Sequence, residues 1–223
     1  MSYVFMKVLE SSSSRYDRGI RLLTLGRIDR VYERLASYIE NGWKVLDIGC
    51  GTGAVAIRAA LKGAHVVGID INPQMLEIAD RQVRKMDLSG RVELREQGVA
   101  ELSDGPSAQY DAAVCSLVFS ELTGDERVYT LHELRRLLKP GGMLLVASEI
   151  IPSQFCKRML YRTVRIPLAI LTYILTQTGT GALRNLPELI GEAGFIIEEE
   201  RVNRPGSFIE LACRNPGVAG DTR

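Results

Sequence analysis

The stretch Val-Leu-Asp-Ile-Gly-Cys-Gly-Thr-Gly at residues 45–53 constrains this chain more than any other. Its apolar residues, interrupted by Asp47, predict a buried strand, and three glycines within the next five positions predict a sharp turn. The apolar run at residues 54–61 predicts a helix directly after the turn. A strand, a glycine turn and a helix together aim backbone N–H groups and a helix N-terminus at a ligand. Glycine leaves room for that ligand or for positive φ angles.

A second strand narrows the kind of ligand. Residues 66–69 are apolar apart from Gly68 and lead into Asp70, which lies 21 residues after Gly49 (70 − 49). In a doubly wound sheet the first and second strands end side by side, so a carboxylate there can accept hydrogen bonds from a ribose diol. The spacing Gly49-x-Gly51-x-x-Ala54 also satisfies the looser dinucleotide fingerprint. A nicotinamide oxidoreductase is therefore an alternative, although Asp47 and Gly53 count against it.

Four segments resemble the motifs of class I S-adenosylmethionine (SAM) dependent methyltransferases, in the family's order and over most of the chain. They are residues 45–53, Gly-Ile-Asp-Ile-Asn-Pro-Gln-Met-Leu at 68–76, Gln-Tyr-Asp with the following strand at 109–114, and Leu-Lys-Pro-Gly-Gly at 138–142. The resemblance implies one α/β domain over residues 1–223, with a Rossmann-like, doubly wound, seven-stranded sheet whose last strand is antiparallel. It also implies SAM as the methyl donor and S-adenosylhomocysteine as the product.

The hydrophobic pattern gives the expected elements around these motifs. The resemblance adds an N-terminal helical cap at 1–42, and a helical insertion at 150–183 interrupts the βα alternation after strand five. Strands are expected at 43–48, 64–69, 91–94, 110–117, 143–148, 195–201 and 207–213, with helices at 53–62, 72–86, 125–138 and 186–193. The apolar run at 166–176 is about half as long as a spanning helix needs. No transmembrane segment is therefore expected, while peripheral membrane contact through the insertion stays open.

Composition excludes several other classes of protein. The formal net charge is +1, which gives no broad field for nucleic acid. The four cysteines are scattered without a C-x-x-C pair, so neither a metal site nor a disulfide framework is expected. No signal peptide is visible, and the expected location is the reducing cytoplasm.

The resemblance assigns a role in SAM binding to ten positions. The glycines would let the chain approach the amino-acid part of SAM, Asp47 would accept from its ammonium group, Asp70 would hold both ribose hydroxyls, and Ile71 would cover adenine. The positions are Asp47, Gly49, Cys50, Gly51, Gly53, Asp70, Ile71, Val99, Ala100 and Ser116. Ser116 would lie beside the methionine part, and Cys50 would pack inside the turn.

Val99 departs from the family pattern. Residues 97–102 match a segment in which many members have an aspartate after the glycine, and that aspartate binds the adenine amino group. Here Val99 occupies the place. Adenine recognition is therefore expected to rest on the backbone near Ala100, on Glu101 or on water.

The reaction itself needs alignment of the acceptor and exclusion of water, and a general base only for a protonated acceptor of high pKa. The candidates are Glu121, after strand four, and Tyr16, in the N-terminal cap; the alternatives are a helix-capping Glu121 and a surface Tyr16. The insertion at 150–183 is expected to form a helical lid over the acceptor, unless it is a helix packed permanently on the sheet.

The acceptor itself is expected to be a small molecule, a lipid-like molecule or a protein-bound cofactor. Short stretches, including residues 98–101 and 119–122, resemble methyltransferases associated with corrinoid proteins, which would make a corrinoid protein a partner. A noncatalytic SAM-binding regulatory subunit is the alternative.

Overall fold

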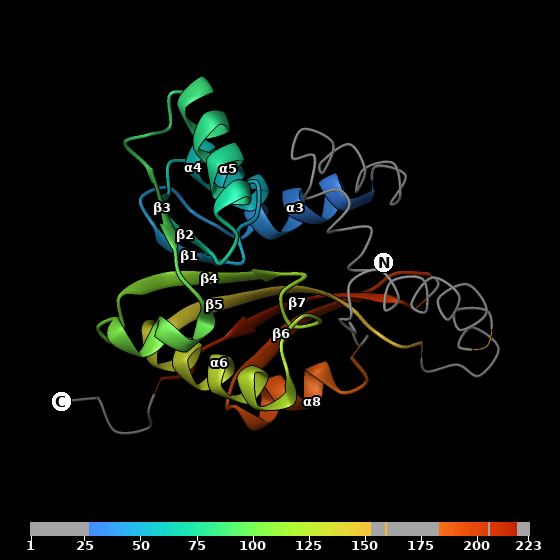
Figure 1. The fold of residues 1–223 in the computed structure, drawn as a ribbon. Coiled ribbons are helices and arrows are strands. Elements are labelled where there is room, and N and C mark those ends of the chain that lie inside the picture. The colour runs from blue at the N-terminus through green and yellow to red at the C-terminus, as the bar shows by residue number, and fades with distance from the viewer. Residues whose placement is uncertain (1–26, 153–158, 160–182, 205, 218–223) are drawn as a thin grey trace.

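A seven-stranded sheet forms the centre of the molecule, in the order β3-β2-β1-β4-β5-β7-β6 (Figure 1). The structure is a computed structural model and describes residues 27–152, 159, 183–204 and 206–217. The strands are β1 Lys44–Ile48, β2 His65–Asp70, β3 Val92–Glu96, β4 Tyr110–Ser116, β5 Leu138–Glu149, β6 Ile196–Val202 and β7 Phe208–Arg214. Neighbours from β3 to β5 pair in parallel, whereas β7 is antiparallel to both β5 and β6. The predicted Rossmann-like sheet with an antiparallel last strand is confirmed.

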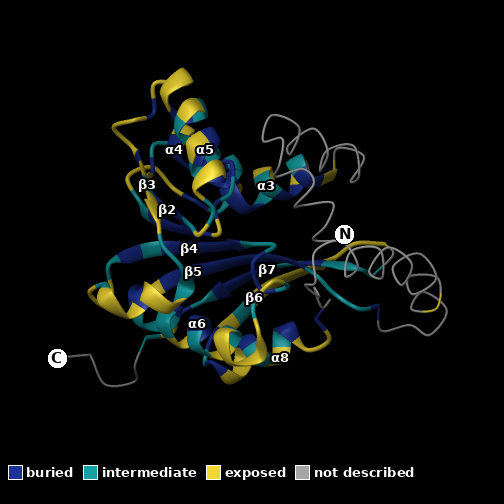
Figure 2. Cartoon of the chain, in the orientation of Figure 1, coloured by how far each residue is buried: buried dark blue, intermediate teal, exposed yellow. Residues whose placement is uncertain are grey.

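Helices cover both faces of the sheet (Figure 1). One face carries α3 Arg27–Ser37, α4 Ala54–Leu61 and α5 Pro73–Lys85. The other face carries the 3₁₀ helix η1 Val99–Asp104, α6 Gly124–Leu137 and α8 Leu186–Glu192. The central strands β4, β5 and β7 are almost wholly buried between these layers, as Figure 2 shows. Near-continuous apolar strands are typical of a sheet covered on both faces.

The ends of two helices follow directly from the sequence. Asn72 begins α5, where its side-chain oxygen accepts from the N–H of Gln74 at 3.0 Å and Pro73 takes the first helical position. Thr123 begins α6 in a capping box with Glu126, whose carboxylate accepts from the Thr123 N–H at 2.7 Å. Both helices start at the edge of the sheet where the parallel strands end.

β5 differs from its prediction. It begins at Leu138 and not at Met143, because Leu138 already pairs with Tyr110 of β4. The ladder then shifts register, and Gly141 takes a positive φ of 79° within the strand. The Leu-Lys-Pro-Gly-Gly motif at 138–142 therefore lies inside the bounds of β5 and not before them.

The two ends of the insertion meet beside the end of β5. After β5, Ile150 forms an isolated parallel bridge with Leu183. The Ile151 N–H donates to the Leu183 carbonyl at 2.9 Å, and the Leu183 N–H donates to the Glu149 carbonyl at 3.2 Å. The predicted helical lid lies otherwise outside the described residues, as does the N-terminal cap before Arg27. Across the described part of the chain, no helix is long and apolar enough to cross a bilayer.

Candidate functional site

The glycine turn after β1 has the geometry that its sequence predicted. Gly49, Gly51 and Gly53 have φ angles of +60°, +54° and +79°, a region that other residues adopt at a cost. A Cβ on Gly49 would lie 2.5 Å from Cγ2 of Val118, so the turn also packs against the loop after β4. A Cβ on Gly51 would meet nothing within 4 Å, because this glycine faces an open cavity.

Asp47 is buried beneath the turn. Its side chain is 2% exposed, and Oδ2 accepts the N–H of Ala56 in the first turn of α4 at 3.1 Å. Burial raises the pKa of Asp47 to about 7, and the negative charge of Asp70 contributes to the increase. The structure thus holds a carboxylate poised near neutral pH at the positive end of a helix.

Asp70 joins the second strand to the turn. Its Oδ2 accepts from the Gly51 N–H at 2.8 Å, and its Oδ1 accepts from the Asn72 N–H at 2.8 Å. Each oxygen keeps a lone pair for a further donor. Desolvation raises the pKa of Asp70, although hydrogen bonds from Asn72 and Gly51 oppose the increase. The carboxylate is therefore fixed in direction, with both oxygens at the cavity.

One cavity of about 580 Å³ gathers these groups at the carboxyl ends of β1, β2, β3 and β4. Tyr32 of α3 lines it beside the turn, and Ile71, which is 76% exposed, lines it beside Asp70. Ser116 at the end of β4 also lines it, and the Oγ of Ser116 is buried without a hydrogen-bond partner in the described structure. An unsatisfied buried hydroxyl in such a cavity suits a ligand that brings the missing partner.

The cavity carries negative charge. Its charged lining residues are Asp47, Asp70, Glu121 and Glu126, and no lysine, arginine or histidine is among its described lining residues. The hydrogen bonds of the capping box at Thr123 lower the pKa of Glu126. A cavity with this lining favours a cation and disfavours phosphate groups.

The loop after β3 closes one end of the cavity, where Val99 and Ala100 contribute to the lining. Helix α6 holds this loop from behind. The Tyr129 hydroxyl donates to the Ala100 carbonyl at 3.1 Å, and the Arg136 guanidinium donates to the carbonyls of Gly105 at 2.7 Å and Leu102 at 3.0 Å. The loop is therefore attached to the body of the domain.

The loop after β4 forms the opposite wall, with Leu117, Val118, Glu121 and Leu122. Leu117 takes a φ of +67°, an uncommon conformation for a residue other than glycine. Its carbonyl accepts from the Ser120 hydroxyl at 2.9 Å, and its N–H donates to Ala147 at 2.7 Å. Outliers of this kind cluster at functional sites.

The structure brings most of the predicted positions together. Nine of the ten positions assigned to SAM binding line the cavity, as does the proposed base Glu121. Gly53 does not line it and instead starts α4 in a left-handed conformation. Cys50 is among the lining residues, and its thiol packs on Gly68, where a Cβ would lie 3.0 Å from Sγ. Tyr16 lies outside the described residues.

Three contributors were not predicted. Tyr32 lies on α3, a helix that the sequence assigned to the N-terminal cap. The spacing of the apolar residues in that helix does not indicate that Tyr32 lines a cavity. Val118 directly follows the apolar strand predicted at 110–117, and its residue type gives no sign that it lines the cavity. The Tyr129 and Arg136 contacts join α6 to a loop about thirty residues earlier, which no local pattern reveals.

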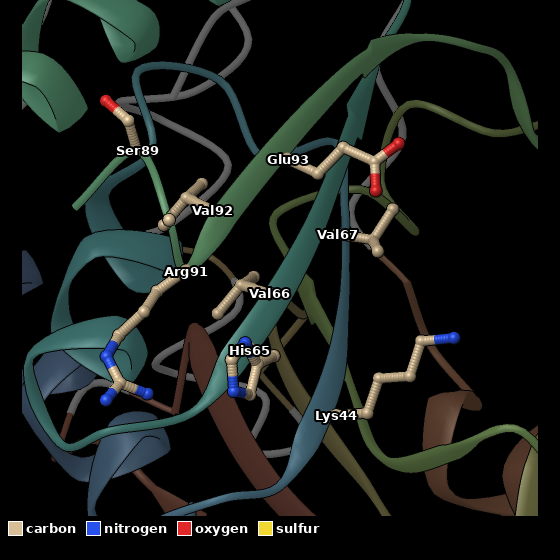
Figure 3. A pocket seen from close by; sticks show the side chains of 9 residues that line it. Lys44, His65, Val66, Val67, Ser89, Arg91, Val92 and Glu93 are labelled. Atoms are coloured by element: carbon tan, nitrogen blue, oxygen red, sulfur yellow. The ribbon is translucent and has the colours of Figure 1, made fainter.

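A second hollow of about 330 Å³ lies at the opposite edge of the sheet (Figure 3). It is lined by Lys44, His65, Arg91 and Glu93, at the amino ends of β1, β2 and β3. Parallel sheets of this type bind their ligands at the carboxyl ends. His65 therefore lies away from the main cavity.

Comparison with known proteins agrees with this fold. Residues 45–142 match the family model of the methyltransferase domain. The chain belongs to the class I SAM-dependent methyltransferase superfamily.

Among its relatives is the ubiquinone/menaquinone biosynthesis C-methyltransferase of Geobacter sp. (strain M21), 34% identical over 64% of this chain and 62% of the relative. The protein of the same description from Geotalea daltonii is 30% identical over 70% of this chain and 67% of the relative. The chain thus spans only about two thirds of the length of these relatives.

A solved structure, magnesium protoporphyrin IX methyltransferase from Synechocystis PCC 6803 with bound S-adenosylhomocysteine, has the same fold. Its TM-score is 0.66 at 19% identity, over 83% of this chain and 82% of that one.

Proposed function

We propose that this chain is a SAM-dependent methyltransferase that acts on a small-molecule, lipid-like or protein-bound acceptor. The observation that carries the proposal is the carboxylate lining of the main cavity, with Asp70 at the end of β2 and Asp47 beneath the glycine turn. SAM carries positive charge at sulfur and at its ammonium group, whereas a nicotinamide dinucleotide carries a pyrophosphate. The lining favours the first and opposes the second.

The residues present fit this donor. When bound, SAM supplies a methyl group already activated by its positive sulfur. Asp70 would accept from the ribose diol, and Asp47 would offset the ammonium charge, directly or through water. Ser116 would gain a partner for its Oγ, and Ile71 would cover one face of the base. The open side of Gly51 leaves room for the amino-acid part.

The acceptor would enter beside the loop after β4. Glu121 lies there at the cavity and is exposed, so we assign it the role of general base where the acceptor must lose a proton. Leu117 and Leu122 give the same wall an apolar surface, which suits an aromatic or lipid-like acceptor. The quinone-pathway names of the relatives support this class.

Two predictions from the sequence extend the proposal. The segment at 150–183 would shape the acceptor site, since both of its ends are fixed at the end of β5. Cytoplasmic location is supported by three free, buried cysteines, Cys50, Cys115 and Cys213. A corrinoid protein stays among the proposed acceptors on sequence resemblance alone.

Binding measurements test the donor assignment. Calorimetry should detect SAM and S-adenosylhomocysteine, and NAD should not compete. Asp70→Asn should weaken S-adenosylhomocysteine about tenfold to a hundredfold, because a hydrogen bond to a charged group contributes roughly 1.5–3 kcal/mol. Glu96→Gln is the matched control, since Glu96 pairs with Asp70 in register on the next strand but does not line the cavity. Equal losses in the two variants would refute the site.

Turnover separates the enzyme from a regulatory SAM-binding subunit. Incubation with methyl-labelled SAM and an extract of the source cells should release S-adenosylhomocysteine, and mass spectrometry should locate the label. A label on a quinone, on another small molecule or on a corrinoid protein would define the acceptor. Binding without any label transfer would favour the regulatory subunit.

A further inference from the structure

The base-binding end of the cavity has an unusual composition. Ile71 and the loop at 97–100 pack against each other there, because a Cβ on Gly98 would lie 3.3 Å from Cγ2 of Ile71. Ile71 directly follows Asp70, so a nucleoside whose ribose is held by Asp70 has its base beside the surface that Ile71 and this loop form together. This step rests on the proposed function.

The polar side chains at this end already bond to backbone groups. The Gln97 amide donates to the Glu101 carbonyl at 3.1 Å, and the Asn72 side chain accepts from Gln74 at the start of α5. Glu101 accepts from the Gly98 N–H at 3.2 Å, and its side chain lines a different hollow on the face of the sheet. Val99, half-buried, adds only methyl groups to the lining.

The loop itself is held in place from α6. Tyr129 and Arg136 donate hydrogen bonds to four of its backbone carbonyls, those of Ala100, Leu102, Ser103 and Gly105. A loop fixed in this way can present a constant surface and constant backbone groups to a flat base. It does not depend on a charged side chain to select the base.

We propose that this chain binds the purine through the shape of Val99 and Ile71 and through the backbone of the loop, and that no side chain among the described residues binds the 6-amino group. The site would then accept purine nucleosides that lack this group or carry a substituent on it. Its specificity would reside in the ribose and the amino-acid part.

The test compares two ligands by calorimetry. One is S-adenosylhomocysteine, and the other is its analogue with hydrogen in place of the 6-amino group, which keeps N1 as an acceptor. The wild-type dissociation constants should lie within about fivefold of each other. Val99→Asp should widen the gap to about tenfold or more, because a carboxylate there can accept from the amino group.

Val99→Ala is the control. It should weaken both ligands equally, because it removes packing and adds no acceptor. A difference larger than fivefold between the two wild-type dissociation constants would overturn the proposal, whether or not Val99→Asp folds. The variant Gln97→Met would then show whether the Gln97 side chain binds the 6-amino group. Failure of S-adenosylhomocysteine itself to bind would instead refute the proposed function.

Discussion

The ionised side chain of Asp47 has opposite effects on the stability of the fold and on the binding of a cationic ligand. Its carboxylate is buried against the Ala56 N–H, and the charge that acts on its pKa is that of the Asp70 carboxylate. No cationic side chain is among the described groups that influence it. Ionised Asp47 therefore weakens the empty fold but prepares the cavity for a cation. Stability and ligand binding are set against each other at this residue.

The consequence is a pH-dependent gain in stability on Asp47→Asn. The folded pKa of about 7 is above the ordinary value of 3.8, so the folded state binds more protons than the unfolded state between these limits, and stability falls as pH rises through them. The amide stays neutral and can still accept from Ala56. The variant should gain on the order of 2–4 kcal/mol relative to wild type at pH 8, with little gain at pH 4.

Urea unfolding followed by the fluorescence of Trp43, the single tryptophan, measures this gain. The same variant should bind S-adenosylhomocysteine more weakly at pH 8. An equal effect on stability at both pH values would show that Asp47 does not titrate in this range.

At the scale of residues, sequence predicted the groups that sit on the glycine turn and at the strand ends. Asp47, Asp70 and the glycines are recognisable because spacing along two adjacent parallel strands fixes where their ends meet. Val118 and Tyr32 were not recognisable, because their place at the cavity depends on packing between segments far apart in the chain. The unusual φ of Leu117 likewise has no signal in an apolar strand end.

Among the elements, α6 has a role beyond covering the sheet. Arg136 on its inner side bonds to the loop at 99–105, while the adjacent Arg135 donates to the Ala193 carbonyl at 3.0 Å, at the end of α8. Two neighbouring arginines thus hold two different elements. A variant of each arginine can therefore separate the effect of the loop on ligand affinity from the effect of α6 on the stability of the domain.

We expect Arg136→Met to loosen the loop and weaken S-adenosylhomocysteine by about three- to tenfold, with a loss of about 1–2 kcal/mol in the free energy of unfolding. Arg135→Met should cost similar stability and leave the affinity unchanged, because its side chain bonds to the carbonyls of Ala193 and Gly217, neither of which lines the cavity. Calorimetry and urea unfolding of both variants measure the two effects. Equal losses of affinity would mean that α6 acts on the site only through global stability.

The elements themselves were predicted to within a few residues where local signals exist. Asn72-Pro73 is a capping pattern that determines the start of α5 through local hydrogen bonds. The start of β5 was missed, because it depends on pairing with Tyr110 and not on the composition of residues 138–142. Strand pairing is a property of two segments, which one segment alone does not show.

For the whole molecule, the bridge between Ile150 and Leu183 brings the two ends of the insertion together beside the end of β5. Replacement of residues 153–182 by a short glycine-serine linker should leave a cooperative unfolding transition and an affinity for S-adenosylhomocysteine within a few fold of wild type. A short linker closes the gap at a modest entropic cost, because the two anchors are already hydrogen-bonded. Methyl transfer to the acceptor should be lost.

Trp43 fluorescence during urea unfolding, calorimetry and the label-transfer assay measure these three quantities on one protein. Aggregation, or loss of the cooperative transition, would show that the segment belongs to the core of the domain. The sequence predicted the sheet from its motifs, but it could not decide between these two roles of the segment. Its apolar residues suit burial against the domain and burial against an acceptor equally well.

The four carboxylates of the cavity also affect how the reaction would end. Transfer of the methyl group removes the positive charge at sulfur, so the cavity would hold the donor more strongly than the product that remains. The Debye length is about 8 Å at physiological ionic strength, so added salt would weaken the hold on the donor more than that on the product. In dilute buffer, SAM would then displace S-adenosylhomocysteine readily. As the salt concentration rises, the enzyme would become more susceptible to inhibition by this product.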